Sequence, residues 1–181
     1  LVHAAAGGVG LLLTQMLAAK GPRVIATTST REKAELARGA GADEVVLYAE
    51  ADLVDDVTRL TDGAGVHVVY DGVGATTFDA GLELLRPRGM MVLYGASSGA
   101  VPPLDPQVLN RQGSLFLTRP TLGHHIASRD ELVGRAGAVL DQVASGALDV
   151  RIGGRYGLED AGRAHADLEG RRTTGKLLIV P

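Results

Sequence analysis

The chain has 181 residues, enough for one large domain or for one domain and part of a second. It carries a net charge of -3 and contains no cysteine. These features exclude disulfides, thiolate nucleophiles and cysteine-ligated zinc within the chain, and they give no reason to expect a nucleic-acid partner. We find no apolar run long enough to span a membrane and no signal peptide. We therefore expect a cytoplasmic protein without a membrane partner.

A glycine-rich turn organises the first part of the chain. The apolar run 1–4 is followed by Ala5-Ala6-Gly7-Gly8-Val9-Gly10 and by an amphipathic stretch that ends near Lys20. The pattern A-x-G-x-x-G is a dinucleotide-binding fingerprint with Ala in place of its first Gly. Gly7 would leave room for a pyrophosphate, Gly10 would let a helix lie close to its strand, and the first-turn N–H groups would attract the anion. A plain strand–turn–helix without a ligand is the alternative.

Strand-like and helical stretches alternate after this turn. Apolar runs predict strands, and apolar residues at helical spacing predict helices. The chain starts inside the first strand without an initiator Met, so we expect a piece of a longer polypeptide. Strict alternation predicts an α/β, doubly wound parallel sheet with ligands at the carboxyl ends of its strands. The predicted strands are 1–4, 24–26, 44–48, 66–70, 90–94 and 114–118, and the helices are 30–38 (capped by Ser29 with Glu32), 53–60 and 78–85.

The end of the second predicted strand bears on the choice of cofactor. A dinucleotide fold that prefers NAD usually has Asp or Glu there, about 20 residues beyond the fingerprint. This chain has Thr28 and Ser29 instead, and hydroxyls would not repel a 2′-phosphate. Lys33 and Arg31 could supply positive charge. We therefore expect NADPH rather than NADH, the alternative being that Ser29 only caps its helix and Lys33 is solvated.

Several motifs, in order, resemble the zinc-free quinone oxidoreductases of the medium-chain dehydrogenase/reductase superfamily. The resemblance implies hydride transfer from NADPH to a quinone or an α,β-unsaturated carbonyl. An enoyl-type reductase and a non-catalytic NADPH-binding protein are the alternatives. The motifs are His3-Ala4-Ala5-Ala6-Gly7-Gly8-Val9-Gly10, Val69-Tyr70-Asp71-Gly72-Val73-Gly74, Gly95-Ala96-Ser97-Ser98-Gly99 and Leu117-Thr118-Arg119-Pro120.

The same resemblance implies positions for the cofactor-binding residues. In such proteins the residues matching Gly8 and Val9 meet the pyrophosphate. Residues near Gly95 and those from Phe116 to Thr118 approach the nicotinamide. Without the family, Tyr48 would be read as the end of a strand and Arg171 as a surface residue. The set implied around the adenosine 2′-phosphate is Ser29, Thr30, Arg31, Lys33 and Tyr48, with Arg171 reaching back to the same cofactor.

The resemblance also implies how the chain divides. Residues 1–125 would form the Rossmann domain, and 126–181 would complete a preceding GroES-like catalytic domain that this chain lacks. The strand-like runs 150–152 and 176–180, which flank a helix at about 158–168, would then lack partners. Because unpaired buried backbone is costly, we expect this tail to pair differently or to be stabilised by a partner. A homodimer through the edge strand 114–118 is expected as well.

We assign no catalytic acid, base or metal ligand from the sequence. Hydride transfer places the chemistry in the cofactor, which the protein orients and shields. The five histidines are scattered, and the pair His124-His125 is expected on an exposed loop. Asp71, at the end of a strand, either serves function or holds the turn that follows it.

Overall fold

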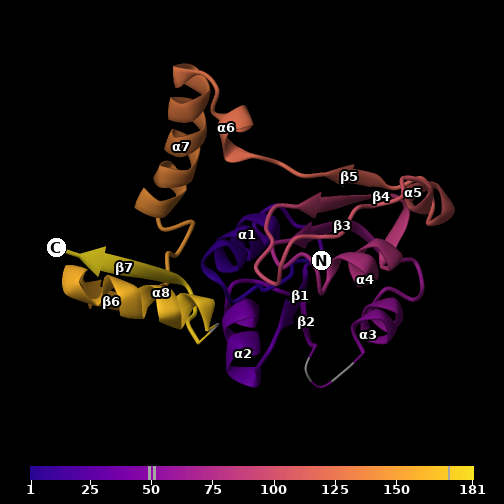
Figure 1. Cartoon of the computed structure of the whole chain (residues 1–181), viewed down its shortest axis with the longest axis horizontal. Coiled ribbons are helices and arrows are strands. Elements are labelled where there is room, and N and C mark those ends of the chain that lie inside the picture. Colours follow the sequence, from indigo (N-terminus) through magenta and orange to yellow (C-terminus); the bar gives the residue numbers. More distant parts are fainter. Residues whose placement is uncertain (49, 51, 171) are drawn as a thin grey trace.

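Parallel strands form a sheet through the first two thirds of the chain (Figure 1). The computed structural model describes residues 1–48, 50, 52–170 and 172–181. Val2 bridges in parallel to Ala26 on one side and to Tyr70 on the other, so the predicted first strand lies at the centre as a short backbone link. The full order is therefore β2–β1–Val2–β3–β4–β5, which is the doubly wound order expected of a dinucleotide fold. The strands are β1 Ile25–Thr28, β2 Glu44–Leu47, β3 Val66–Asp71, β4 Leu85–Leu93 and β5 Phe116–Thr118.

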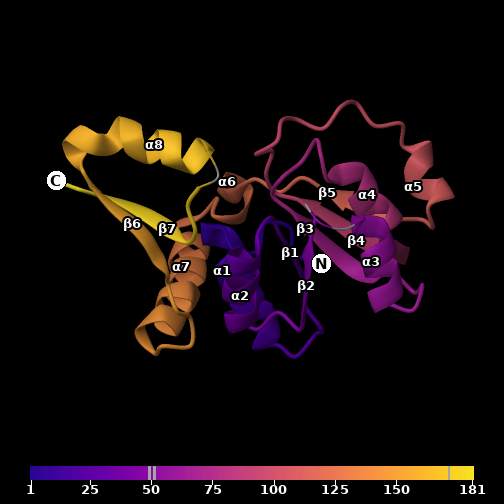
Figure 2. The ribbon, with the colours of Figure 1, turned by 90° about the horizontal axis from the view of Figure 1, so that it is seen from below.

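Helices cover both faces of this sheet, as the alternation predicts (Figures 1 and 2). One buried cluster joins Val2, Val24 and Ala26 to Ala37, with Leu13 and Leu17 packed against it. A second cluster joins strand residues to Val57, Phe78 and Leu82 and the neighbouring leucines. The helices of the first cluster are α1 Gly8–Ala18 and α2 Arg31–Gly39, and those of the second are α3 Leu53–Leu60 and α4 Phe78–Glu83; the short α5 Gln107–Arg111 precedes β5.

Two predicted boundaries are wrong. The helix cap is Thr30, whose hydroxyl accepts a hydrogen bond from Lys33 N at 3.2 Å, so the capping box of Ser29 with Glu32 does not form. The helix predicted over 78–85 ends at Glu83, because Leu85 pairs with Val66 and is buried at the start of β4. Residues 86–89 lie within β4, where its pairing with β3 shifts register.

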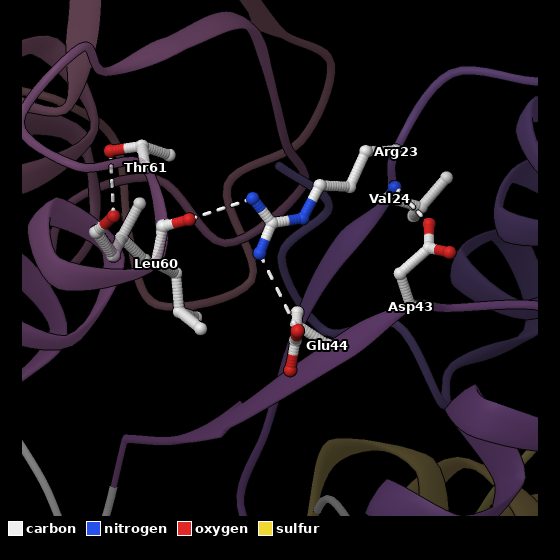
Figure 3. A network of polar contacts seen from close by, with 7 residues as sticks. Arg23, Val24, Asp43, Glu44, Leu60 and Thr61 are labelled. Atoms are coloured by element: carbon white, nitrogen blue, oxygen red, sulfur yellow. Dashed lines mark hydrogen bonds and ion pairs between the residues drawn. The ribbon is translucent and has the colours of Figure 1, made fainter.

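A polar network joins the elements at the amino ends of β1 and β2 (Figure 3). The Arg23 guanidinium donates to the carbonyl of Leu60 at 2.7 Å and pairs with Glu44 at 3.4 Å. The Asp43 carboxylate accepts from Val24 N at 2.7 Å. These contacts hold the end of α3 against the amino ends of both strands. The cavity described below lies at the other end of the strands.

The last third of the chain forms its own small layer beside α1 (Figures 1 and 2). β6 and β7 pair with each other in parallel, so these two strands do not lack strand partners. Tyr156 OH donates to Asp167 at 3.1 Å, and this bond ties β6 to α8. His124 and His125 are exposed, in one helical turn rather than a loop. The elements are α6 Leu122–His125, α7 Arg129–Ala144, β6 Ile152–Gly157, the 3-10 turn η1 Leu158–Asp160, α8 Ala161–Glu169 and β7 Lys176–Val180. Within the described residues, each helix is too short or too polar to cross a membrane.

Candidate dinucleotide site

A cavity of about 620 Å³ opens at the carboxyl ends of the central strands. This is where a doubly wound sheet changes the direction of its strand order, and ligands of such folds bind there. Residues from the glycine-rich turn, from the ends of β1, β2 and β3, and from the C-terminal layer share its wall. The lining residues used below are His3, Gly7, Gly8, Thr27, Thr28, Ser29, Lys33, Tyr48, Asp52, Val73, Thr76, Thr77, Ser97, Leu168, Thr173 and Gly175.

The glycine-rich turn presents bare backbone to this cavity. Gly7 is the N-cap of α1, and within the described part of the chain no side chain caps the first turn, which contains no acidic residue. The positive end of the helix dipole therefore faces the cavity without a competing anion. A Cβ on Gly10 would lie 2.4 Å from the Ala4 carbonyl oxygen, so glycine is required there for the helix to approach its strand.

The ends of β1 and β2 give the cavity a hydroxyl-lined side with positive charge. Thr28, Ser29, Lys33 and Tyr48 line it, and Lys33 Nζ lies 3.5 Å from the Ser29 hydroxyl. The nearby carboxylate of Asp52 caps α3 by accepting from the backbone N–H groups of residues 54 and 55. Hydroxyls and a lysine are the groups expected on a side of the cavity that binds a 2′-phosphate.

Arg31 stands apart from this group. Its side chain is 84% exposed and pairs with Glu50 at 3.2 Å, and it is not among the lining residues. It could reach an anion at Ser29 only after leaving that partner. Thr30 is engaged as the cap of α2.

Asp71 holds the floor of the cavity by hydrogen bonds to the loop that follows it. Its Oδ1 accepts from Val73 N at 2.7 Å and from Gly74 N at 3.0 Å, and its Oδ2 accepts from the Thr77 hydroxyl at 2.8 Å. The side chain is fully buried. The interpretation of Asp71 as the residue that holds this turn is therefore confirmed, and the turn carries Val73 and Thr77 into the cavity wall.

A second loop is locked against the first. The Ser98 hydroxyl donates to the Val73 carbonyl at 2.8 Å and accepts from Thr76 N at 3.1 Å. A Cβ on Gly95 would lie 2.4 Å from the Gly72 carbonyl oxygen, which requires glycine at that crossing. Gly95 packs against the loop that forms the wall without lining the cavity itself, whereas Ser97 lines the cavity.

His3 lines the cavity as a buried neutral imidazole. Its Nδ1 is 3.0 Å from the Thr27 hydroxyl, and its Nε2 has no hydrogen-bond partner among the described residues. Burial lowers the pKa of His3 to about 4, although the nearby Asp71 carboxylate acts in the opposite direction. A histidine in an apolar first strand gave no signal that distinguished it from an ordinary core residue.

The structure brings together only part of the predicted cofactor-binding set. Gly7, Gly8, Ser29, Lys33 and Tyr48 line the cavity. Arg171 lies outside the described residues, and the other predicted residues are not among those that line it, namely Val9, Gly10, Thr30, Arg31, Gly95, Phe116 and Thr118.

From the C-terminal part of the chain, the sequence reasoning named only Arg171 for the cofactor site, and it missed three residues of the wall. Leu168, Thr173 and Gly175 line the cavity, and Gly175 N donates to the Ala6 carbonyl at 3.2 Å. No local pattern announces a contact between residues so far apart in the chain.

Comparison with known proteins agrees with this geometry. The sequence pattern of the family described as Zinc-binding dehydrogenase matches residues 8–132. The chain belongs to this family. It is 44% identical over 183 residues to quinone oxidoreductase 1 of Escherichia coli, covering 100% of this chain and 56% of that protein. The resemblance to quinone oxidoreductases is thereby confirmed, and the chain spans about half the length of the curated relatives it matches.

Solved relatives share the fold over almost the whole chain. A mycobacterial protein solved in complex with NADPH is 53% identical, with a TM-score of 0.95 over 99% of this chain and 56% of that one. The 2-haloacrylate reductase structure is 39% identical, with a TM-score of 0.89 over 99% of this chain and 56% of that one. The curated 2-haloacrylate reductase comes from Burkholderia sp. The doubly wound fold is therefore shown.

The family's description mentions zinc, but the described part of this chain contains no residues arranged to bind it. No group of three His, Asp or Glu side chains there could hold a metal ion.

Proposed function

We propose that this chain is the NADPH-binding part of a reductase that passes hydride to a quinone. The observation that carries the proposal is the cavity that joins an uncapped helix N-terminus to the hydroxyl-lined and positively charged edge at Ser29 and Lys33. A dinucleotide with an added 2′-phosphate would place its pyrophosphate at the first of these ends and the added phosphate at the second. The E. coli relative, named a quinone oxidoreductase, was solved with NADPH, which supports the same choice.

The fit of the cofactor can be stated for residues of this chain. The first-turn N–H groups at Gly8 would face the pyrophosphate, and Ser29 with Lys33 would face the 2′-phosphate. The cofactor supplies the hydride when bound. Asp71 fixes the loop that forms the opposite wall, and loop 95–99 behind it would help to exclude water from the nicotinamide end.

The remaining predicted residues belong to the same proposal. We place Phe116 and Thr118 toward the nicotinamide side and Arg171 near the 2′-phosphate, as the family resemblance implies. We also propose the division into 1–125, which binds the cofactor, and 126–181, which would pack against a catalytic domain outside this chain.

A homodimer through β5 completes the proposal. β5 pairs only with β4 among the described strands, and Phe116 and Leu117 are 56% and 37% exposed. An apolar, one-sided strand of this kind favours pairing with a second copy. Sedimentation should show a dimer for the wild type and a monomer for Leu117→Lys, whereas a monomeric wild type would contradict the dimer.

A reductase for activated alkenes is the second candidate. It is favoured by the 39% identity to a protein named 2-haloacrylate reductase. Both activities would use the same cofactor site, and their acceptor pockets would differ.

The test is NADPH oxidation by the full-length protein, which would include the catalytic domain proposed above, with a benzoquinone, a 2-haloacrylate and an enoyl thioester in parallel. Fastest turnover with the quinone supports the first candidate, and fastest turnover with either alkene supports the second. Tight NADPH binding without turnover of any acceptor would identify a non-catalytic binding protein. Absence of NADPH binding would refute the proposal as a whole.

A further inference from the structure

The start of β7 crosses the mouth of the candidate site directly over the glycine-rich turn. Gly7 and Gly175 form a parallel bridge, and Gly175 N donates to Ala6 O at 3.2 Å. Figures 1 and 2 both place the beginning of β7 next to α1. Residues 173–176 are therefore a strap that lies across the N-terminus of α1.

Lys176 is the cation of this strap, and its side chain extends over Gly8. A Cβ on Gly8 would lie 2.9 Å from the Gly175 carbonyl oxygen and 3.0 Å from Cδ of Lys176. The ammonium is two bonds beyond Cδ, so rotation of the end of the side chain can bring it to the first turn of α1, although Lys176 does not line the cavity in this structure. Gly8 is not one of the fingerprint glycines, and this crossing explains why the position has no side chain.

Among the residues that the structure describes, no carboxylate forms an ion pair with the ammonium of the half-buried Lys176. The first turn of α1 contains no acidic residue. A half-buried cation that can reach the uncapped N–H groups of α1 would add its charge to the positive end of the helix dipole and favour an anion between them.

We propose that Lys176 is a further cofactor-binding residue, which pairs with the pyrophosphate from the side opposite to the N-terminus of α1. This inference rests on the proposed function and adds a second source of charge to the same site. The two lysines of the site then have separate roles. Lys33 serves the 2′-phosphate, which NADPH alone carries, while Lys176 serves the pyrophosphate that NADPH, NADH and ADP-ribose share.

The test compares the affinity of these ligands for the wild-type protein and for Lys176→Met. We expect NADPH, NADH and ADP-ribose to weaken by the same factor of about ten, the size of one charge-assisted hydrogen bond at a partly exposed site. Adenosine 2′-monophosphate, which lacks the pyrophosphate, should bind both proteins equally. Lys176→Arg should keep most of the affinity. Lys20→Met, at the far end of α1, is the matched control and should change nothing.

The outcomes separate a failure of the Lys176 inference from a failure of the proposed NADPH-binding function. If the wild type binds none of the dinucleotides, the proposed function fails. If the wild type binds and Lys176→Met binds equally well, only the role of Lys176 is refuted. Weakening confined to NADPH and adenosine 2′-monophosphate would move Lys176 to the 2′-phosphate and also refute the inference. Should Lys176→Met misfold, as judged by its thermal unfolding, Lys176→Gln provides the same loss of charge with a polar end.

Discussion

The side-chain amide of Gln15, in α1, brackets the backbone of Asp149, which follows α7. Its Oε1 accepts from Asp149 N at 2.8 Å, and its Nε2 donates to Asp149 O at 3.0 Å. The amide thus pairs with the chain as a neighbouring strand would. Together with the bridge between Gly7 and Gly175, it fastens the C-terminal layer to the helix whose N-terminus faces the candidate site.

Replacing Gln15 by Leu should therefore loosen the C-terminal layer. Both hydrogen bonds are lost, at a cost of about 1–2 kcal/mol in the free energy that docks this layer. Hydrogen exchange should accelerate at the amides of Asp149 and Gly175, while the amides of β3 stay protected. Gln142→Leu serves as the control, because the Gln142 amide bonds within its own helix, to the Ala138 carbonyl. Unchanged protection at Gly175 would show that Gln15 does not fasten the layer.

Asp71 offers a prediction about the floor of the site. Asp71→Ala leaves the N–H groups of Val73 and Gly74 and the Thr77 hydroxyl without their buried acceptor. We expect a loss of about 3 kcal/mol or more in the free energy of unfolding by urea. Asp71→Asn retains one acceptor oxygen for the two N–H groups and should lose less. The exposed Asp79→Asn should lie within about 0.5 kcal/mol of wild type, and equal stability of Asp71→Ala and wild type would remove the assigned role.

The sequence predicts the nucleotide-binding half well because its determinants are local. The fingerprint at 5–10 and the absence of a carboxylate at 28–29 are read within a few residues, and the structure places both at one cavity. Gly175 and Gln15 could not be predicted in the same way. Their contacts join residues more than a hundred positions apart, and neither residue type signals such a partner. The ends of α2 and α4 were misplaced because Thr30 competed with Ser29 as a cap and because tertiary pairing drew Leu85 into β4.

Replacing glycine by alanine should have opposite effects on stability at Gly10 and at Gly134. Gly10→Ala would push a Cβ to 2.4 Å from the Ala4 carbonyl, and neither backbone can move without separating helix from strand. We expect a loss of about 3 kcal/mol or the failure to fold. Gly134 lies inside α7 with nothing near its missing Cβ. Gly134→Ala should instead stabilise α7 by about 1 kcal/mol, measured by hydrogen exchange within the helix. A tolerated Gly10→Ala would contradict the close approach.

The lowered pKa of the buried His3 leads us to predict that the protein loses stability in mild acid. Its pKa in the folded protein is about 4, below the ordinary value of 6.5, so the unfolded chain binds the proton more readily. The free energy of unfolding must then fall as the pH drops below 6.5, by about 2 kcal/mol between pH 7 and pH 5. Urea unfolding of wild type and His3→Asn at both values measures this, since the variant should lack that part of the decrease. The exposed His124→Asn should keep the wild-type pH dependence, and an identical decrease in His3→Asn would refute the assignment.

Charge reversal at the end of β1 tests the preference for NADPH. Lys33 lines the cavity 3.5 Å from the Ser29 hydroxyl, whereas Arg31 is paired with Glu50 outside it. Arg31→Glu with Lys33→Glu places negative charge where a 2′-phosphate would lie, so NADPH should weaken by about a hundredfold and NADH by less than about threefold. Reversal of Lys33 alone should account for most of the effect, because Arg31 must leave Glu50 before it can contribute. Arg38→Glu with Arg59→Glu makes the same change of charge on exposed helix positions and should leave both affinities unchanged. Equal weakening of NADPH and NADH by the first pair would mean that this edge of the cavity does not recognise the phosphate.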